Sequence, residues 1–130
     1  MTTTTITITT NFKEGSSVVL TDTKTHLAEA VNKMKETIAI GETDYELFLA
    51  VDISSLKCFA ITSDQDLTIE TNSGSAADDT IALKANIPVV WQEGETAILT
   101  ADIITNIFVT NASGVAANLQ MVFCTDAPAT

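Results

Sequence analysis

Residues 67–83 read LTIETNSGSAADDTIAL and place an apolar-rich run on either side of a polar stretch. Apolar side chains recur at every second position in Leu67–Thr71, a period typical of strands with one buried face. The Asn, Ser and Gly residues that follow favour a turn, because they accept positive φ or hydrogen-bond nearby backbone groups. The stretch therefore predicts that Leu67–Thr71 and Thr80–Leu83 are strands that pair across a loop.

Short strand-like runs recur along the rest of the chain, separated by turn residues. Thr is abundant, and its β-branched side chain suits a half-exposed strand. This arrangement is typical of β-sandwiches and barrels. We predict an all-β fold, a single antiparallel β-sandwich that is jelly-roll-like, over residues 1–130, with residues 1–11 an N-terminal arm or edge strand. The further strands are predicted at residues 2–11, 18–20, 45–53, 56–63, 88–91, 97–104, 106–110 and 119–124.

One segment fits two kinds of secondary structure. In residues 26–40, HLAEAVNKMKETIAI, Leu27, Val31, Met34 and Ile38 recur at helical spacing with good helix formers between them. Helix propensity is a weak determinant, however, and strands are predicted on both sides of this segment. The residues alone leave helix and strand open.

The charge balance limits the partners of the chain. Its 130 residues suffice for one domain and carry 6 Lys plus Arg against 17 Asp plus Glu, a net charge of -11. Nucleic-acid binding requires clustered cations, so we expect no nucleic-acid partner. The N-terminal MTTTTITITTN lacks the cationic and apolar regions of a secretory signal, and no apolar run approaches the roughly 18–20 residues of a membrane span. We expect a soluble protein with no membrane partner.

Both cysteines lie in apolar, strand-like contexts, Cys58 in LKCFAI and Cys124 in MVFCTD. They either face each other across two strands as a disulfide or remain free thiols, which is the more common state of a buried cysteine. Two cysteines this far apart in the sequence form no metal motif.

The acidic end of the opening stretch is a weak candidate for a metal site. Asp78 and Asp79, together with Asn72, offer oxygen ligands of the kind that Ca²⁺ prefers. An EF-hand loop beginning at Asp64 fails at three of its required positions. We favour a solvated loop with acidic caps, and we expect no cofactor.

The residues give little indication of catalysis. The one histidine, His26, belongs to no recognised motif, and the sequence has no Gly-x-Ser-x-Gly elbow and no glycine-rich phosphate loop. Glu93 and Glu95 flank Gly94 in a predicted turn, whereas glycosidase carboxylates are usually accompanied by groove-lining aromatic residues, which are scarce here. We expect no enzymatic activity.

A second polar stretch, TNASG at residues 110–114, echoes the TNSG of residues 71–74. Its Asn111-Ala112-Ser113 fits the N-glycosylation sequon, which only a secreted eukaryotic chain would use. Turn chemistry explains both stretches, so we interpret each as the connection of a hairpin.

Several short sequence motifs, taken together, resemble those of a family of small structural proteins of tailed bacteriophages. The run VDISSLKCFAITSDQDLTIETNSGSAADDTIALKANIPVVW, followed by LTADIITNIFVTNASGVAANLQMVF, matches the family pattern. That pattern comprises Val-Asp-x-Ser-x-Leu-Lys, Ser-Asp-x-Asp-x-Thr-x-Glu-Thr-Asn, Asp-Asp-Thr-Ile-x-Leu and Val-Thr-Asn-Ala-Ser-Gly. The match covers about residues 45–124. Relatives carry a more strand-like segment in place of residues 26–40, so the resemblance implies a strand at residues 28–36.

The resemblance also implies a function. All-β capsid decoration (cement) proteins are the functional counterpart among tailed-phage proteins of this size, and the family implies no enzyme and no cofactor. We therefore expect a virion protein, made in the host cytoplasm, that binds and stabilises the outer head shell. Its partners would be the major capsid protein and copies of itself, as a homo-oligomeric dimer or trimer. The alternatives are a receptor- or carbohydrate-binding module of a tail or head fibre, and a tail or connector subunit.

The composition is compatible with a place on the outer surface of a particle. Acidic charge keeps decorated particles soluble and apart. A small sandwich needs its strand edges covered, which neighbouring copies or a shell can do. The Thr-rich N-terminal strand either pairs with a neighbour by strand addition or is an ordinary edge strand. Its candidate interaction residues are Thr3, Thr5, Thr7, Thr9 and Phe12.

Overall fold

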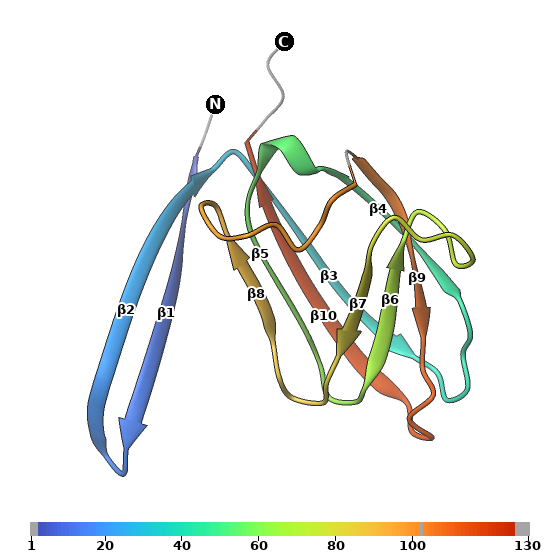
Figure 1. The fold of residues 1–130 in the computed structure, drawn as a ribbon, viewed down its shortest axis with the longest axis horizontal. Helices are drawn as coiled ribbons and strands as arrows, with labels where there is room; N and C mark the ends of the chain where they lie inside the picture. Colours follow the sequence, from blue (N-terminus) through green and yellow to red (C-terminus); the bar gives the residue numbers. More distant parts are fainter. Residues whose placement is uncertain (1–2, 102, 127–130) are drawn as a thin grey trace.

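The computed structural model describes residues 3–101 and 103–126, which form ten β-strands and one short 3-10 helix (Figure 1). Strands β1 (Thr4–Glu14) and β2 (Ser17–Ala28) form a hairpin that stands beside a sandwich of the other strands. The described residues contain no helix long and apolar enough to cross a membrane. The sandwich strands are β3 (Ala30–Ile38), β4 (Tyr45–Asp52), β5 (Leu56–Ser63), β6 (Leu67–Thr71), β7 (Thr80–Leu83), β8 (Val89–Gln92), β9 (Ile103–Thr110) and β10 (Ala117–Thr125), with η1 (Ile53–Ser55) between β4 and β5.

The sandwich consists of two antiparallel four-stranded sheets, with strand orders β3-β10-β5-β8 and β4-β9-β6-β7. Successive strands mostly alternate between the sheets, which is the connectivity of a jelly roll. The predicted all-β, jelly-roll-like sandwich is thus confirmed. The predicted pairing of Leu67–Thr71 with Thr80–Leu83 is also confirmed, since β6 and β7 are antiparallel with Ile69 opposite Ile81.

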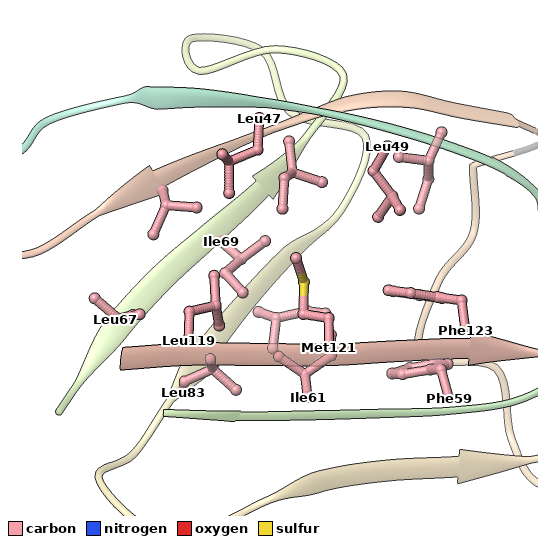
Figure 2. Packing of buried hydrophobic residues seen from close by; sticks show 14 of the residues in the cluster. Leu47, Leu49, Phe59, Ile61, Leu67, Ile69, Leu83, Leu119, Met121 and Phe123 are labelled. Carbon is pink, nitrogen blue, oxygen red and sulfur yellow. The ribbon is translucent and has the colours of Figure 1, made fainter. Parts of the chain in front are cut away.

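Alternating side chains build one core between the two sheets. Figure 2 shows Leu47 and Leu49 of β4 on one side of this core and Leu119, Met121 and Phe123 of β10 on the other. The ring of Phe59 stacks between Phe123, at 5.3 Å between centroids, and Trp91, at 6.1 Å. The period-two pattern of the sequence therefore corresponds to burial on one face of each strand.

The ambiguous segment is a strand, close to the range that the resemblance implied. Strand β3 pairs with β10 from Ala30 opposite Thr125 to Ile38 opposite Ala117. This pairing supplies backbone partners to one side of β10, and a helix in the same place would leave those groups unpaired. Tertiary pairing therefore outweighs the helical propensity of residues 26–40.

The strand predicted at residues 106–110 is confirmed as part of β9, which begins at Ile103, whereas the strand predicted at residues 97–104 is wrong over residues 97–101. Residues 97–101 form a loop. The Asp79 carboxylate accepts hydrogen bonds from the backbone amides of Thr100 and Ala101, which are then not available to a sheet. Leu99 is buried and anchors this loop in the core. Residue 102, like residue 2 of the predicted strand 2–11 and residues 1–2 of the predicted arm, lies outside the described residues.

The short strand predicted at residues 18–20 is part of a much longer one. Strand β2 pairs with β1 over its whole length, from Ser17 opposite Glu14 to Ala28 opposite Thr4. Because most residues of β2 are polar, the sequence shows no alternation of apolar and polar residues from which the full length of this strand could be predicted. The hairpin is therefore longer than the sequence predicted.

The TNASG stretch is not a hairpin turn, which corrects the prediction. It joins β9 to β10, and these strands belong to opposite sheets. Buried Asn111 holds the crossing, since its Nδ2 donates to the carbonyl oxygens of Ile38, Ala39 and Val115 at 3.1, 3.2 and 2.8 Å. The same turn chemistry thus serves a hairpin at TNSG and a crossing between sheets at TNASG, and the sequon asparagine has its amide engaged in the fold.

Replacing Ile69 by Ala is expected to lower the free energy of unfolding by about 2–5 kcal/mol, because it opens a cavity between the sheets. Ile69 is 1% exposed. The matched control is Thr68→Ala on the other face of β6, which is expected to change stability by less than about 0.5 kcal/mol. Urea unfolding followed by circular dichroism measures both, and equal losses would contradict the assignment of the two faces.

Candidate functional site

The most prominent surface feature is the β1–β2 hairpin, residues 4–28, here called the arm. It diverges from the sandwich toward its turn at Gly15 and lies beside the sheet that contains β8 (Figure 1). Gly15 has φ of 61°, a left-handed conformation that glycine adopts without strain. The arm therefore presents two long strands with few contacts to the rest of the molecule.

The base of the arm is seated on the outer face of the sheet β3-β10-β5-β8. Ile6, Ile8 and Ala28 pack against Cys58 of β5 and Cys124 of β10. A polar contact supports this seat, since the ring Nε2 of His26 lies 2.9 Å from Oε1 of Gln92 on β8. The one histidine is thus an anchor between the arm and the sandwich.

The same face of the arm ends in an exposed apolar pair. Ile6, Ile8, Thr10 and Phe12 point to this face of β1, and Phe12 lies opposite Leu20 of β2. Phe12 is 58% exposed and Leu20 is 55% exposed. A β-bulge next to this pair adds Val19, and Val18 follows in the next cross-strand pair, whose side chains point to the other face of the arm; both valines are exposed. These four residues, called the arm tip, have no covering element in the part of the chain that the structure describes.

The predicted interaction residues are divided between the two faces of the arm. Thr5, Thr7 and Thr9 alternate with Ile6 and Ile8, so they lie on the opposite, exposed face. Thr3 precedes β1 and is also exposed. Phe12 lies on the face that seats the arm. The signal that would have distinguished the faces was the position of Ile6, Ile8 and Phe12, which are separated by even numbers of residues and so share one face of a strand.

The two cysteines lie directly opposite each other on β10 and β5 and are free thiols. Both are buried beneath the base of the arm. Burial, and then the neighbouring thiol of Cys124, raises the pKa of Cys58 to about 12. Because the thiolate is the reactive form, this environment protects the thiol of Cys58.

We expect iodoacetamide to alkylate Cys58 in the native protein at pH 8 at least about a hundredfold more slowly than in urea, since a raised pKa removes thiolate. Mass spectrometry of the labelled peptides measures both rates. Fast native labelling would contradict the buried pair. No labelling in urea without reductant would show a disulfide instead.

Asp78 and Asp79 both make hydrogen bonds within their own loop region. Both carboxylate oxygens of Asp79 accept from the Thr100 amide, at 3.0 and 2.9 Å, and Oδ1 also accepts from Thr100 Oγ1 at 2.7 Å. Asp78 accepts from Nδ2 of Asn72 at 2.8 Å. Among residues 3–101 and 103–126, no three His, Cys, Asp or Glu side chains gather as metal ligands. Asp79 therefore acts as a structural clamp on the loop before β9.

The pKa of Asp79 reflects this clamp. Partial burial opposes its ionisation, but the hydrogen bonds from the Thr100 side chain and from the Ala101 and Thr100 amides outweigh burial and hold the pKa below its ordinary value. The folded-state pKa is thus lower than the unfolded one. The carboxylate stabilises the fold fully above the ordinary Asp pKa of about 4, and this contribution is lost as the pH falls through the lowered folded-state pKa.

Asp79→Ala is expected to lower the free energy of unfolding at pH 7 by about 1–3 kcal/mol, because it removes an acceptor of charge-assisted hydrogen bonds. The difference from the wild type should shrink as the pH falls below about 4. Asp78→Ala, which removes one exposed contact, is the matched control. Urea titrations from about pH 2.5 to about pH 7, which spans the titration of a carboxylate, measure the effect. A loss of stability that does not depend on pH would contradict the clamp.

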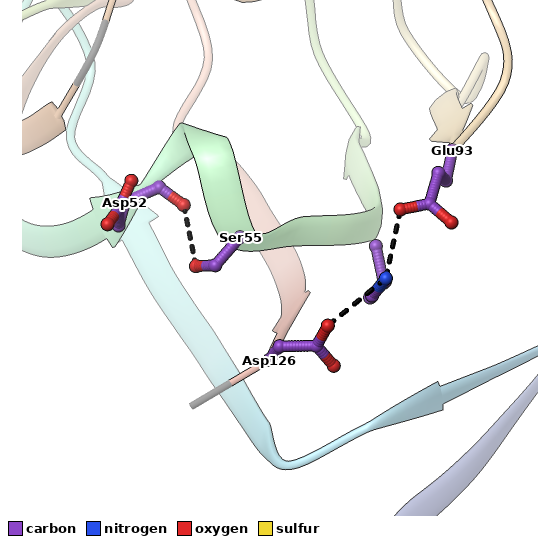
Figure 3. A network of polar contacts seen from close by, with 5 residues as sticks. Asp52, Ser55, Glu93 and Asp126 are labelled. Carbon is purple, nitrogen blue, oxygen red and sulfur yellow. Dashed lines mark hydrogen bonds and ion pairs between the residues drawn. The ribbon is translucent and has the colours of Figure 1, made fainter. Parts of the chain in front are cut away.

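The glutamates of the predicted WQEGET turn do not form a carboxylate pair around a groove. Glu93 instead binds Lys57, with Nζ to Oε2 at 2.9 Å, and Asp126 binds the same Nζ at 3.1 Å (Figure 3). Hydrogen bonds from Lys57 to Glu93 and Asp126 raise the lysine pKa. On the neighbouring η1 segment, Ser55 Oγ donates to the Asp52 carbonyl oxygen at 3.0 Å. This network joins the start of β5 to the ends of β8 and β10.

Comparisons with known proteins identify no family. No protein-family model matches the chain, and no curated protein sequence matches it. Among solved structures, it is similar to a chain from a Bacillus structure described as "Bacillus endospore appendages form a novel family of disulfide-linked pili", with 12% identity and a TM-score of 0.39. The alignment covers 98% of this chain and 93% of the other. Similarity at this level carries no argument about function.

Proposed function

We propose that the protein is a non-enzymatic structural subunit of a tailed-phage virion, and specifically a capsid decoration protein that binds the outer head shell through its arm. The observation that carries the proposal is the arm tip at the end of a projecting hairpin, where exposed Phe12 lies opposite exposed Leu20 and exposed Val18 and Val19 adjoin them at the bulge. Contiguous apolar side chains on a protruding element are typical of an interaction site.

The physical state of the arm supports docking. A two-stranded hairpin without a covering layer is marginally stable in water. Burying one large apolar side chain on a partner contributes about 1.5–3 kcal/mol, so two or more such residues give a useful contact. The outer strand edges of the arm also offer backbone groups for strand addition. A partner would therefore order the tip as well as bind it.

The choice of a phage shell as the partner rests on the sequence resemblance over about residues 45–124. The major capsid protein and copies of the chain itself are the proposed partners, at the head surface of the virion. The net charge of -11 suits an outer surface and opposes contact with the enclosed genome.

A carbohydrate-binding fibre module has less support. Trp91, the one tryptophan, stacks on Phe59 of the core, and its Nε1 donates to the Thr96 carbonyl oxygen at 3.1 Å. It is therefore not an exposed platform for a sugar ring. A tail or connector subunit would use the same arm at another place on the particle.

The test is binding to preformed head shells assembled from the major capsid protein of the same genome. We expect the wild-type chain to sediment with the shells and to raise their melting temperature. The double variant Phe12→Ser/Leu20→Ser should bind at least about tenfold more weakly, because about 1.4 kcal/mol of lost contact is a factor of ten. Thr9→Ala/Thr23→Ala, a cross-strand pair on the opposite face of the arm, is the matched control. If the wild-type chain neither sediments with the shells nor raises their melting temperature, the proposal is refuted.

A further inference from the structure

The two outer faces of the sandwich carry opposite charge. On the sheet β3-β10-β5-β8, one row of outward residues crosses all the strands as Lys33, Val122, Ala60 and Val90. Lys35 lies in the next row. The outward positions of these strands hold no carboxylate among the described residues, since Glu36 is in register with the core residue Leu119. We call this the lysine face.

One carboxylate at the border of the lysine face is engaged in hydrogen bonds. Asp64 lies just beyond β5, where its oxygens accept from the backbone amide and Nδ2 of Asn118 at 2.8 and 2.9 Å. The backbone hydrogen bond from Asn118, followed by that from its side chain, holds the pKa of Asp64 below its ordinary value. Lys33 and Lys35 form no ion pair within 4.0 Å among the described residues. The face is thus locally cationic on a strongly acidic chain.

The outer face of the sheet β4-β9-β6-β7 has the complementary character. Phe108 lies between two glutamates, with Glu46 opposite it on β4 and Glu70 opposite it on β6. Phe48, the next outward residue of β4, is 78% exposed. Asp52 adds a third carboxylate, and the outward positions of these strands hold no lysine among the described residues. We call this the acidic face.

We propose that copies of this chain associate head to tail, with the lysine face of one copy packed on the acidic face of the next. At a net charge of -11, two copies repel in most orientations. Opposition of these two faces brings Lys33 and Lys35 toward Glu46 and Glu70, so it replaces repulsion by attraction.

The same orientation also matches apolar surface. The 37% exposed Val90 of one copy would meet Phe48 and Phe108 of the next. Apolar contact at the centre with charged residues around it is the usual anatomy of a protein interface. Because the two surfaces differ, the contact is heterologous and generates a ring or an open chain of copies.

The arm covers part of the lysine face. Its base packs on the row that contains Cys58 and Cys124 and on the neighbouring Val122, and the ribbon diverges from the sheet toward the tip (Figure 1). Lys33, Lys35 and Val90 remain exposed. The inference rests on the proposed structural role and assigns a different partner to each surface. The arm would bind the shell, and the two sandwich faces would bind other copies of the chain.

The test uses two charge-reversed variants of the full chain, Lys33→Glu/Lys35→Glu and Glu46→Lys/Glu70→Lys. Sedimentation velocity at about physiological ionic strength should show concentration-dependent self-association of the wild type, because a screening length of about 8 Å reduces the long-range repulsion between copies more than the contacts between faces. Each variant alone should associate at least about tenfold more weakly, because its altered face repels the intact one. An equimolar mixture should restore association, since every face then has a complementary partner.

A wild type that stays monomeric, variants that associate like the wild type, or a mixture that fails to restore association would each overturn the proposal. Circular dichroism of each variant checks that it is folded. Phe12→Ser/Leu20→Ser is expected to keep wild-type self-association while losing shell binding. Failure of the face contact with intact shell binding would therefore refute this inference alone, and the reverse result would refute the proposed function alone.

Discussion

The packing of β10 is the interaction on which the rest of the structure depends. This strand lies between β3 and β5, and its inward residues Leu119, Met121 and Phe123 are buried against the opposite sheet. Its outward residue Cys124 lies under the base of the arm. One strand therefore supports the core on one side and orients the arm on the other. A change in the register of β10 would move both together, because a shift by one residue exchanges the two faces.

Polar side chains, rather than regular secondary structure, hold the connections at the strand ends. Asn72, with φ of 64°, accepts from the Thr105 amide and donates to the Ile103 carbonyl oxygen. Asp79 clamps the loop before β9, and Asn111 holds the crossing between β9 and β10. Their oxygens and amides are satisfied by backbone groups, so the TNSG and DD residues of the opening stretch serve the fold. Gly74 fits the same account, since a Cβ there would lie 2.8 Å from Cγ of Asp44.

The sequence predicted the sandwich because each core strand buries one face, which leaves a two-residue period in residues such as those of β6. It did not predict the full arm, since β2 is exposed along nearly its whole length and such a strand carries no burial pattern. The sequence did not show whether TNASG connects two strands of one sheet or two strands of opposite sheets. The turn residues determine only the local reversal of the chain, whereas packing in the core determines which sheet the next strand joins. Among candidate site residues, the sequence predicted Phe12 but not Val18, Val19 and Leu20 as its partners at the tip. Cross-strand register places Leu20 opposite Phe12, and Val18 and Val19 lie at the adjoining bulge.

The two kinds of surface respond differently to solution conditions. Contacts of the arm tip would be apolar, and salt screening has little effect on them. Contacts between the lysine and acidic faces would be electrostatic, and the screening length falls to about 8 Å at physiological ionic strength. The excess negative charge opposes the contact between faces, so association in solution should require a high protein concentration. If arms hold several copies side by side on one particle, as proposed, the local concentration would be high and a weak contact between faces would be sufficient. The shell would therefore determine where copies meet, and the charge on the two faces would determine their orientation.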